Sequence, residues 1–252
     1  MRVLAIKNRK NELQTMEKLI ARQALPHGLV PLVEIMKLDI EYDKKRNPVT
    51  GEYVTEPKTI KGGKVINCKV DDPETERDIT LSNISSLFTG RLAFVDFLRC
   101  DLSQYKRVKH EDIGLVIELT LNLEKYVARL LEVAEYDNLI PVIAIKSGME
   151  KLAPAKVRDL LALFRERCPG RPLAIRIDEV DGYEAVLQQC LGAEDYLIYD
   201  INEQPFASRT YEYGELRDLN LRCTTILLCS PREREANNGE FVHKEYAEII
   251  DN

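Results

Sequence analysis

The sequence predicts a single α/β domain of the (β/α)8 barrel type over residues 1–252, and three observations support this fold class. Short β-branched apolar runs alternate with amphipathic helical stretches along most of the chain. Residues 171–202 contain a complete strand–helix–strand unit, which requires a parallel sheet covered by helices. The length suits one large domain better than two ordinary ones.

The N-terminal part begins with two predicted strands joined by a helix. Residues 3–7 form the first strand, and residues 11–25 carry apolar positions along one helical face, with Asn11 as the N-cap. Residues 29–35 form the second strand, which has Glu34 near its C-terminal end. We therefore expect Glu34 at the face of the barrel where the strands end.

An insertion over residues 37–78 follows the second strand. Charged residues, Gly, Pro and Thr dominate it, and the turn sequence Lys61-Gly62-Gly63-Lys64 favours a hairpin or meander. Three roles stay open for it: a lid, a partner-binding arm, or a segment without function.

The remaining predicted elements continue the alternation of strands and helices. Strands are predicted at residues 91–98, 113–119, 139–145, 171–178, 195–202 and 223–229. Helices are predicted at residues 79–88, 122–134, 154–168, 179–191, 211–219 and 241–250. Residues 113–119 also fit a helix, which would leave a barrel of seven strands.

A seven-strand barrel would leave an apolar edge between residues 3–6 and 224–228. Such an edge favours pairing with further β-structure. We predict that another chain, the insertion or a second copy covers it, and that the isolated chain otherwise self-associates.

Composition narrows the class of protein. Hydrophobic residues make up 44% and charged residues 31%, and no stretch is long and apolar enough to span a membrane, so we expect a cytoplasmic protein. The six cysteines lack CxxC or zinc-ligand spacing and are expected as reduced thiols. A net charge of -6 argues against bulk attraction to nucleic acid, although it is compatible with a local basic patch.

Five short segments at the predicted strands share a further likeness: residues 32–35, 94–97, 143–146, 173–178 and 199–202. In these segments the chain resembles the phage and bacterial "beta protein" family. The resemblance implies a barrel-like fold, an origin in phage or mobile-element genomes and a role in defence against phage, with no established reaction. The chain departs from the family by its long insertion and its short C-terminal end.

Charged residues stand at the ends of the predicted strands, where loops of parallel barrels form active sites. They are Glu34, Asp96, Glu118, Lys146, Arg176, Asp178 and Asp200. A set of carboxylates without clustered histidine predicts a Mg2+ or Mn2+ site, and its expected ligands are Glu34, Asp96, Asp178 and Asp200. Such an ion would activate water for phosphoester hydrolysis, with Lys146, Asp178 and Arg176 as catalytic candidates.

A structural interpretation stands beside the catalytic one. Asp178 and Asp200 could cap the following helices, and Arg176 and Lys146 could pair with the acids inside the barrel. Lys146 could also form a Schiff base if burial depressed its pKa. Two functions therefore stay open: a sensor or partner-binding component of anti-phage defence acting through residues 37–78 or an open barrel edge, and a metal-dependent phosphoester hydrolase. The sequence does not decide whether the protein is an enzyme.

Overall fold

The structure is a computed structural model that describes residues 2–26, 28–99, 113–145, 152–202 and 210–229. The chain divides into two compact units, which are considered separately below. The first comprises Met1–Lys37 and Phe88–Asn252, and the second comprises Leu38–Leu87.

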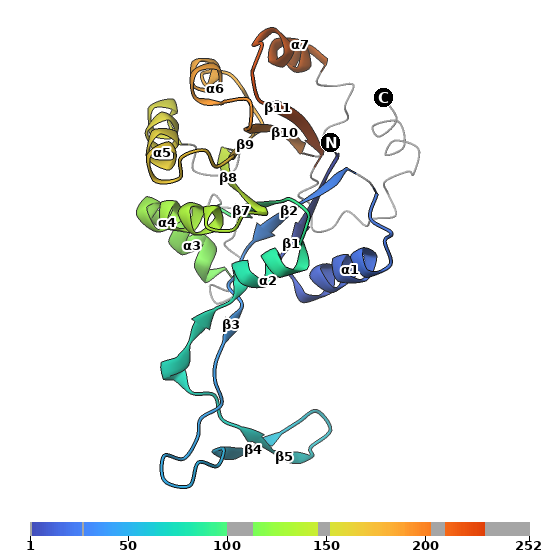
Figure 1. Cartoon of the computed structure of the whole chain (residues 1–252), viewed down its shortest axis with the longest axis vertical. Helices are drawn as coiled ribbons and strands as arrows, with labels where there is room; N and C mark the ends of the chain where they lie inside the picture. The colour runs from blue at the N-terminus through green and yellow to red at the C-terminus, as the bar shows by residue number, and fades with distance from the viewer. Residues whose placement is uncertain (1, 27, 100–112, 146–151, 203–209, 230–252) are drawn as a thin grey trace. The chain divides into compact units, whose positions relative to one another are not determined.

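Seven parallel strands form the curled sheet of the first unit (Figure 1). Their order in the sheet is β1 (Arg2–Lys7), β2 (Leu29–Ile35), β7 (Ala93–Phe97), β8 (Leu139–Ile145), β9 (Ala174–Ile177), β10 (Tyr196–Asn202) and β11 (Thr224–Cys229). Neighbouring strands in the sheet follow one another within this unit, and every pair is parallel. The mixed α/β class and the parallel sheet agree with the prediction from the sequence.

Helices lie along the outer side of this sheet (Figure 1). They are α1 (Lys10–Ala21), α3 (Gly114–Leu121), α4 (Leu123–Ala134), α5 (Pro154–Arg167), α6 (Glu184–Cys190) and α7 (Thr210–Asp218). Helix α4 packs on β7 and β8 and begins at Asn122, whose side chain accepts a hydrogen bond from the backbone N–H of Lys125. Pro154 occupies the first turn of α5, where its missing N–H has no helical partner to lose.

An apolar cluster fills the inner side of the curled sheet. Its buried members are Val30, Leu32, Phe94, Ile140, Val142, Ala174, Ile198, Ile226 and Leu228. Because side chains alternate between the two faces of a strand, the residues two positions beyond these members also belong to the inner face. This alternation fixes which strand-end side chains enter the candidate site.

Two sequence predictions concern local structure. Of the strand and the helix that stayed open for residues 113–119, the helix is confirmed: residues 114–119 lie in α3, where Val116, Leu119 and Thr120 are buried at helical spacing. The sheet therefore has seven strands. Helix α1 begins after Arg9, so Asn11 is not its N-cap, and it ends at Ala21 because Gln23 adopts a positive φ of 54°.

The second unit contains two antiparallel pairs. Strand β3 (Ile40–Glu41) pairs with β6 (Arg77–Asp78), and β4 (Thr55–Thr59) pairs with β5 (Val65–Lys69). A 3-10 turn, η1 (Pro73–Thr75), and helix α2 (Thr80–Leu87) complete the unit. Gly62 and Gly63 both have positive φ in the turn between β4 and β5, a conformation that glycine adopts at little cost.

Strands β1 and β11 approach each other without pairing in the part of the chain that the structure describes. Their Cα atoms come within 8 Å, yet no ladder joins them among those residues. Leu4 and Leu227 are 40% and 43% exposed on these strands. Residues 241–250, which were predicted as a closing helix, lie outside the described residues. That further structure covers the edge between β1 and β11 therefore stays a prediction.

Four of the six cysteines, Cys68, Cys168, Cys190 and Cys223, are free thiols. The side chains of the other two are not among those that the structure describes. Among the described helices, none has both the length and the apolar character that a membrane span requires.

Candidate functional site

Four charged side chains meet on the inner face of the sheet, at the C-terminal ends of its strands. Each follows a member of the inner apolar cluster by two positions, and together they are Glu34, Asp96, Arg176 and Asp200. The register places Glu34 of β2 directly beside Asp96 of β7. We call these four residues the arginine–carboxylate cluster.

Arg176 joins the three carboxylates by direct hydrogen bonds. Its Nη1 donates to Glu34 Oε1 and to Asp96 Oδ2, each at 2.7 Å. Its Nε donates to Asp200 Oδ2 at 2.9 Å, and Nη2 lies 2.7 Å from that same oxygen. The side chains of Arg176, Asp96 and Asp200 are at most 1% exposed, whereas that of Glu34 is 15% exposed.

These bonds require the sheet to curl. Between β2 and β9 stand β7 and β8, so Glu34 and Arg176 would be roughly 14 Å apart on a flat sheet with strand spacing of about 4.8 Å. An arginine side chain cannot cover that distance. The cluster therefore connects β9 with β2, β7 and β10 across the interior of the curled sheet.

The electrostatics of Arg176 reflect both burial and charge. Burial alone would lower the pKa of Arg176, because a low-dielectric interior disfavours the charged form. The carboxylates of Glu34, Asp200 and Asp96 more than offset this effect, so the pKa is raised above its ordinary value. The guanidinium is consequently a permanent cation in the middle of the cluster.

The other predicted site residues have different positions. Asp178 directly follows β9 and is 5% exposed. Lys146 lies outside the described residues. Glu118 belongs to α3, and its carboxylate forms an exposed ion pair with Lys125 instead of standing at a strand end.

The metal prediction can be compared with the geometry. Within the described ranges, no three or more His, Cys, Asp or Glu side chains are grouped so that they could hold a metal ion. The oxygens named above accept hydrogen bonds from Arg176, and a carboxylate oxygen that does so is less able to ligate an ion. The Mg2+ or Mn2+ site at Glu34, Asp96, Asp178 and Asp200 stays a prediction.

A pocket of about 290 Å3 lies beyond the end of β7. It is lined by Arg99, Thr120, Leu121, Leu123, Leu152, Ala153 and Lys156. The guanidinium carbon of Arg99 lies 5.0 Å from the centre of the Tyr126 ring. The pocket thus has two cationic side chains, which can accommodate an anion, whereas the hydroxyl of Thr120 donates to the carbonyl of Val116.

Tyr126 links this pocket to the sheet. Its hydroxyl donates to the carbonyl of Val142 at 3.2 Å and accepts from the N–H of Ala144 at 3.3 Å. Burial raises the pKa of Tyr126, and the charge of Asp96 adds to the increase. Sequence reasoning missed Tyr126, because its contacts depend on how α4 packs on β8.

The fold and the cluster together define an α/β protein with a curled parallel sheet and a buried arginine–carboxylate cluster at its strand ends. No family model matches the chain, and no curated protein or solved structure matches it either. The resemblance to the "beta protein" family therefore stays a prediction.

Proposed function

We propose that the protein is a partner-binding component on a TIM-barrel-like scaffold, and that the Leu38–Leu87 unit supplies the binding surface. The observation that carries this proposal is the exposure of β4 and β5. Nine of their ten residues are exposed, and the tenth, Cys68, is half-buried. A two-stranded hairpin without a buried face is marginally stable alone, so this one is well suited to gain stability from a partner.

The cluster supports the scaffold part of the proposal. Arg176 already binds the three carboxylates, which gives them a structural role within the first unit. The resemblance in the strand sequences implies a phage or mobile-element setting, and we extend the proposal to a sensor or partner-binding role in defence against phage.

A deletion tests this function. Residues 44–69 are replaced by a short Gly-Ser linker, which the geometry allows because the N–H of Asp72 donates to the carbonyl of Asp43 at 2.9 Å. Cross-linking in the native host, followed by identification of the bound proteins and nucleic acids, should show that the deletion loses partners that the full chain retains. The melting temperature of the first unit is measured as a control for folding. Identical partner sets for both chains would refute the proposal.

A second candidate function is a divalent-metal-dependent phosphoester hydrolase. One observation favours it: the pocket beyond the end of β7 contains Arg99 and Lys156, two cations that could hold a phosphate group. A thermal-shift series with Mg2+, Mn2+ and Ca2+ tests it on wild type and Asp178→Asn. An ion that binds only the native state raises the melting temperature. The absence of any shift in the wild type would reject this candidate.

A further inference from the structure

We propose that residues 44–69, which we call the basic ribbon, bind the phosphate backbone of a B-form DNA duplex. The inference rests on the proposed function, because it names the partner of the same unit. Five features of the unit lead to it: the segregation of its charge, the pairing of its acidic side chains, the exposure of its lysines, the cations at the Tyr53 ring and the shape of β4 with β5.

Charge is strongly segregated within the second unit. The basic ribbon contains seven Lys or Arg and two Asp or Glu, a net charge of +5. The rest of the unit, residues 38–43 and 70–87, contains eight acidic residues and one basic residue, a net charge of -7. A chain of net charge -6 thus concentrates positive charge in one stretch of 26 residues. A local field of this kind attracts polyanions even when the whole protein does not.

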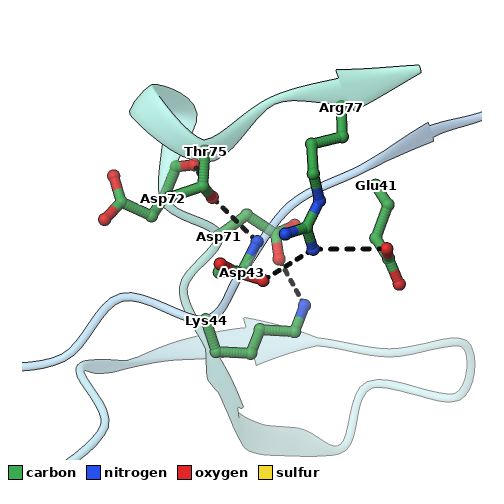
Figure 2. Close-up of polar contacts among 7 residues, drawn as sticks. All are labelled: Glu41, Asp43, Lys44, Asp71, Asp72, Thr75 and Arg77. Atoms are coloured by element: carbon green, nitrogen blue, oxygen red, sulfur yellow. Dashed lines mark hydrogen bonds and ion pairs between the residues drawn. The ribbon is translucent and has the colours of Figure 1, made fainter. Parts of the chain in front are cut away.

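The acidic part pairs with its one arginine and with the first lysine of the basic ribbon (Figure 2). Arg77 Nη2 lies 2.8 Å from Asp43 Oδ1 and 3.3 Å from Glu41 Oε2. Lys44 forms an ion pair with Asp71 at the boundary between the two parts. The surplus of acid there repels phosphate, which favours approach of a polyanion to the basic ribbon.

The lysines of the ribbon are available to a ligand. Lys45, Lys58, Lys61 and Lys64 are all exposed, and none of them belongs to an ion pair among the described residues. Lys61 and Lys64 flank the glycine turn between β4 and β5. Phosphate contacts from such side chains release bound counterions, which is the main source of sequence-independent affinity.

Two further cations are held on an aromatic ring. The guanidinium carbon of Arg46 lies 4.1 Å, and Lys69 Nζ 3.6 Å, from the centre of the Tyr53 ring. Arg46 Nη2 also donates to the Tyr53 hydroxyl at 2.7 Å. A protein partner usually binds through an aromatic anchor that it can bury. Tyr53 is 40% exposed, but two cations lie against its ring, so the arrangement favours an anionic ligand.

The shape of β4 with β5 suits a duplex. The two strands pair in full antiparallel register from Thr55 opposite Lys69 to Thr59 opposite Val65. A two-stranded ribbon fits the major groove of B-form DNA, which is about 12 Å wide. Five residues per strand extend roughly 17 Å, and the tip at Gly62 and Gly63 carries no side chains.

Fluorescence anisotropy with the full chain tests the inference, using a labelled 20-base-pair DNA duplex, an RNA duplex of equal length and polyglutamate. We expect a duplex to bind at low salt and to weaken as salt rises. In K61E/K64E the loss of affinity between 50 and 200 mM salt should be about tenfold smaller, because two phosphate contacts are gone. The control K10E/K18E makes the same charge change on exposed residues of α1 and should bind like wild type.

The outcomes separate this inference from the proposed function. Binding of the DNA duplex more tightly than the RNA duplex supports the inference, and the reverse preference would overturn the assignment of B-form DNA. Three results would overturn the inference. They are failure of both duplexes to bind, an equal loss of affinity in K61E/K64E and K10E/K18E, and binding of polyglutamate with the same salt dependence as a duplex. If the duplexes fail while the 44–69 deletion still loses cross-linked partners, the proposed function stands and only the duplex assignment is wrong. K61Q/K64Q repeats the test without charge reversal, and unchanged melting temperatures confirm folding.

Discussion

Replacement of Arg176 by Met gives the sharpest test of the arginine–carboxylate cluster. Methionine keeps an apolar stem of similar length, so the main loss is the guanidinium rather than volume. Asp96 and Asp200, both 0% exposed, then lose their arginine partner inside the sheet. Removing one partner of a buried ion pair costs about 3–5 kcal/mol, and we expect a loss of this size in the free energy of unfolding.

A matched control is Arg165→Met. Arg165 pairs with buried Asp195, but Asp195 also accepts hydrogen bonds from the N–H groups of Leu173, at 3.1 Å, and Gly192, at 2.6 Å. Because Arg165 is 35% exposed and pairs with one carboxylate, whereas Arg176 is 1% exposed and pairs with three, we expect a smaller loss of about 1–2 kcal/mol. Urea titrations followed by circular dichroism measure both. Equal losses in the two variants, or less than about 1 kcal/mol for Arg176→Met, would refute the reasoning. Adding Asp96→Asn and Asp200→Asn should recover part of the loss.

Three further predictions address other features. The pKa of the Cys223 thiol is raised by burial to about 11 from an ordinary 9.0; its stabilising contribution is therefore complete below pH 9 and lost as pH rises towards 11. Cys223→Val should show a weaker fall in melting temperature over that range, and an identical fall would contradict the assignment. The edge between β1 and β11 exposes Leu4 and Leu227, and we expect light scattering to detect self-association that L4K/L227K reduces, unless other parts of the chain cover this edge. A monodisperse monomer with that edge bare would count against it. Glu118→Gln breaks only an exposed ion pair with Lys125 and should change stability by less than about 1 kcal/mol in a urea titration, whereas a strand-end site residue would cost more.

The strands were predictable because parallel strands buried on both faces appear as continuous apolar runs. Residues 139–145 show this clearly, since all seven are buried in β8. The run at 113–119 shows the limit of the same signal. A short apolar run fits a buried strand and a buried helix equally well, and here the packing of α3 decided the outcome.

The sequence predicted which residues belong to the arginine–carboxylate cluster better than it predicted which carboxylates Arg176 binds. Alternation along each strand puts Glu34, Asp96, Arg176 and Asp200 on one face. That Arg176 reaches Glu34 depends on the curl of the sheet, which no local pattern encodes. In contrast, the charge segregation of the second unit can be read directly from the sequence, once residues 37–78 are divided at the boundaries of the basic ribbon.

The cluster also constrains the order of events during synthesis. Arg176 follows Glu34 by 142 residues and Asp96 by 80 residues. At about 5–20 residues per second, the ribosome needs roughly 4–16 s to add the arginine after Asp96 has been made. During that interval the carboxylates of Glu34 and Asp96 have no Arg176 to pair with and favour hydration by water. This hydration opposes early curling of β2 and β7 around an unfilled interior. We therefore expect the nascent sheet to stay open until β9 arrives, which would make curling one of the later steps of folding.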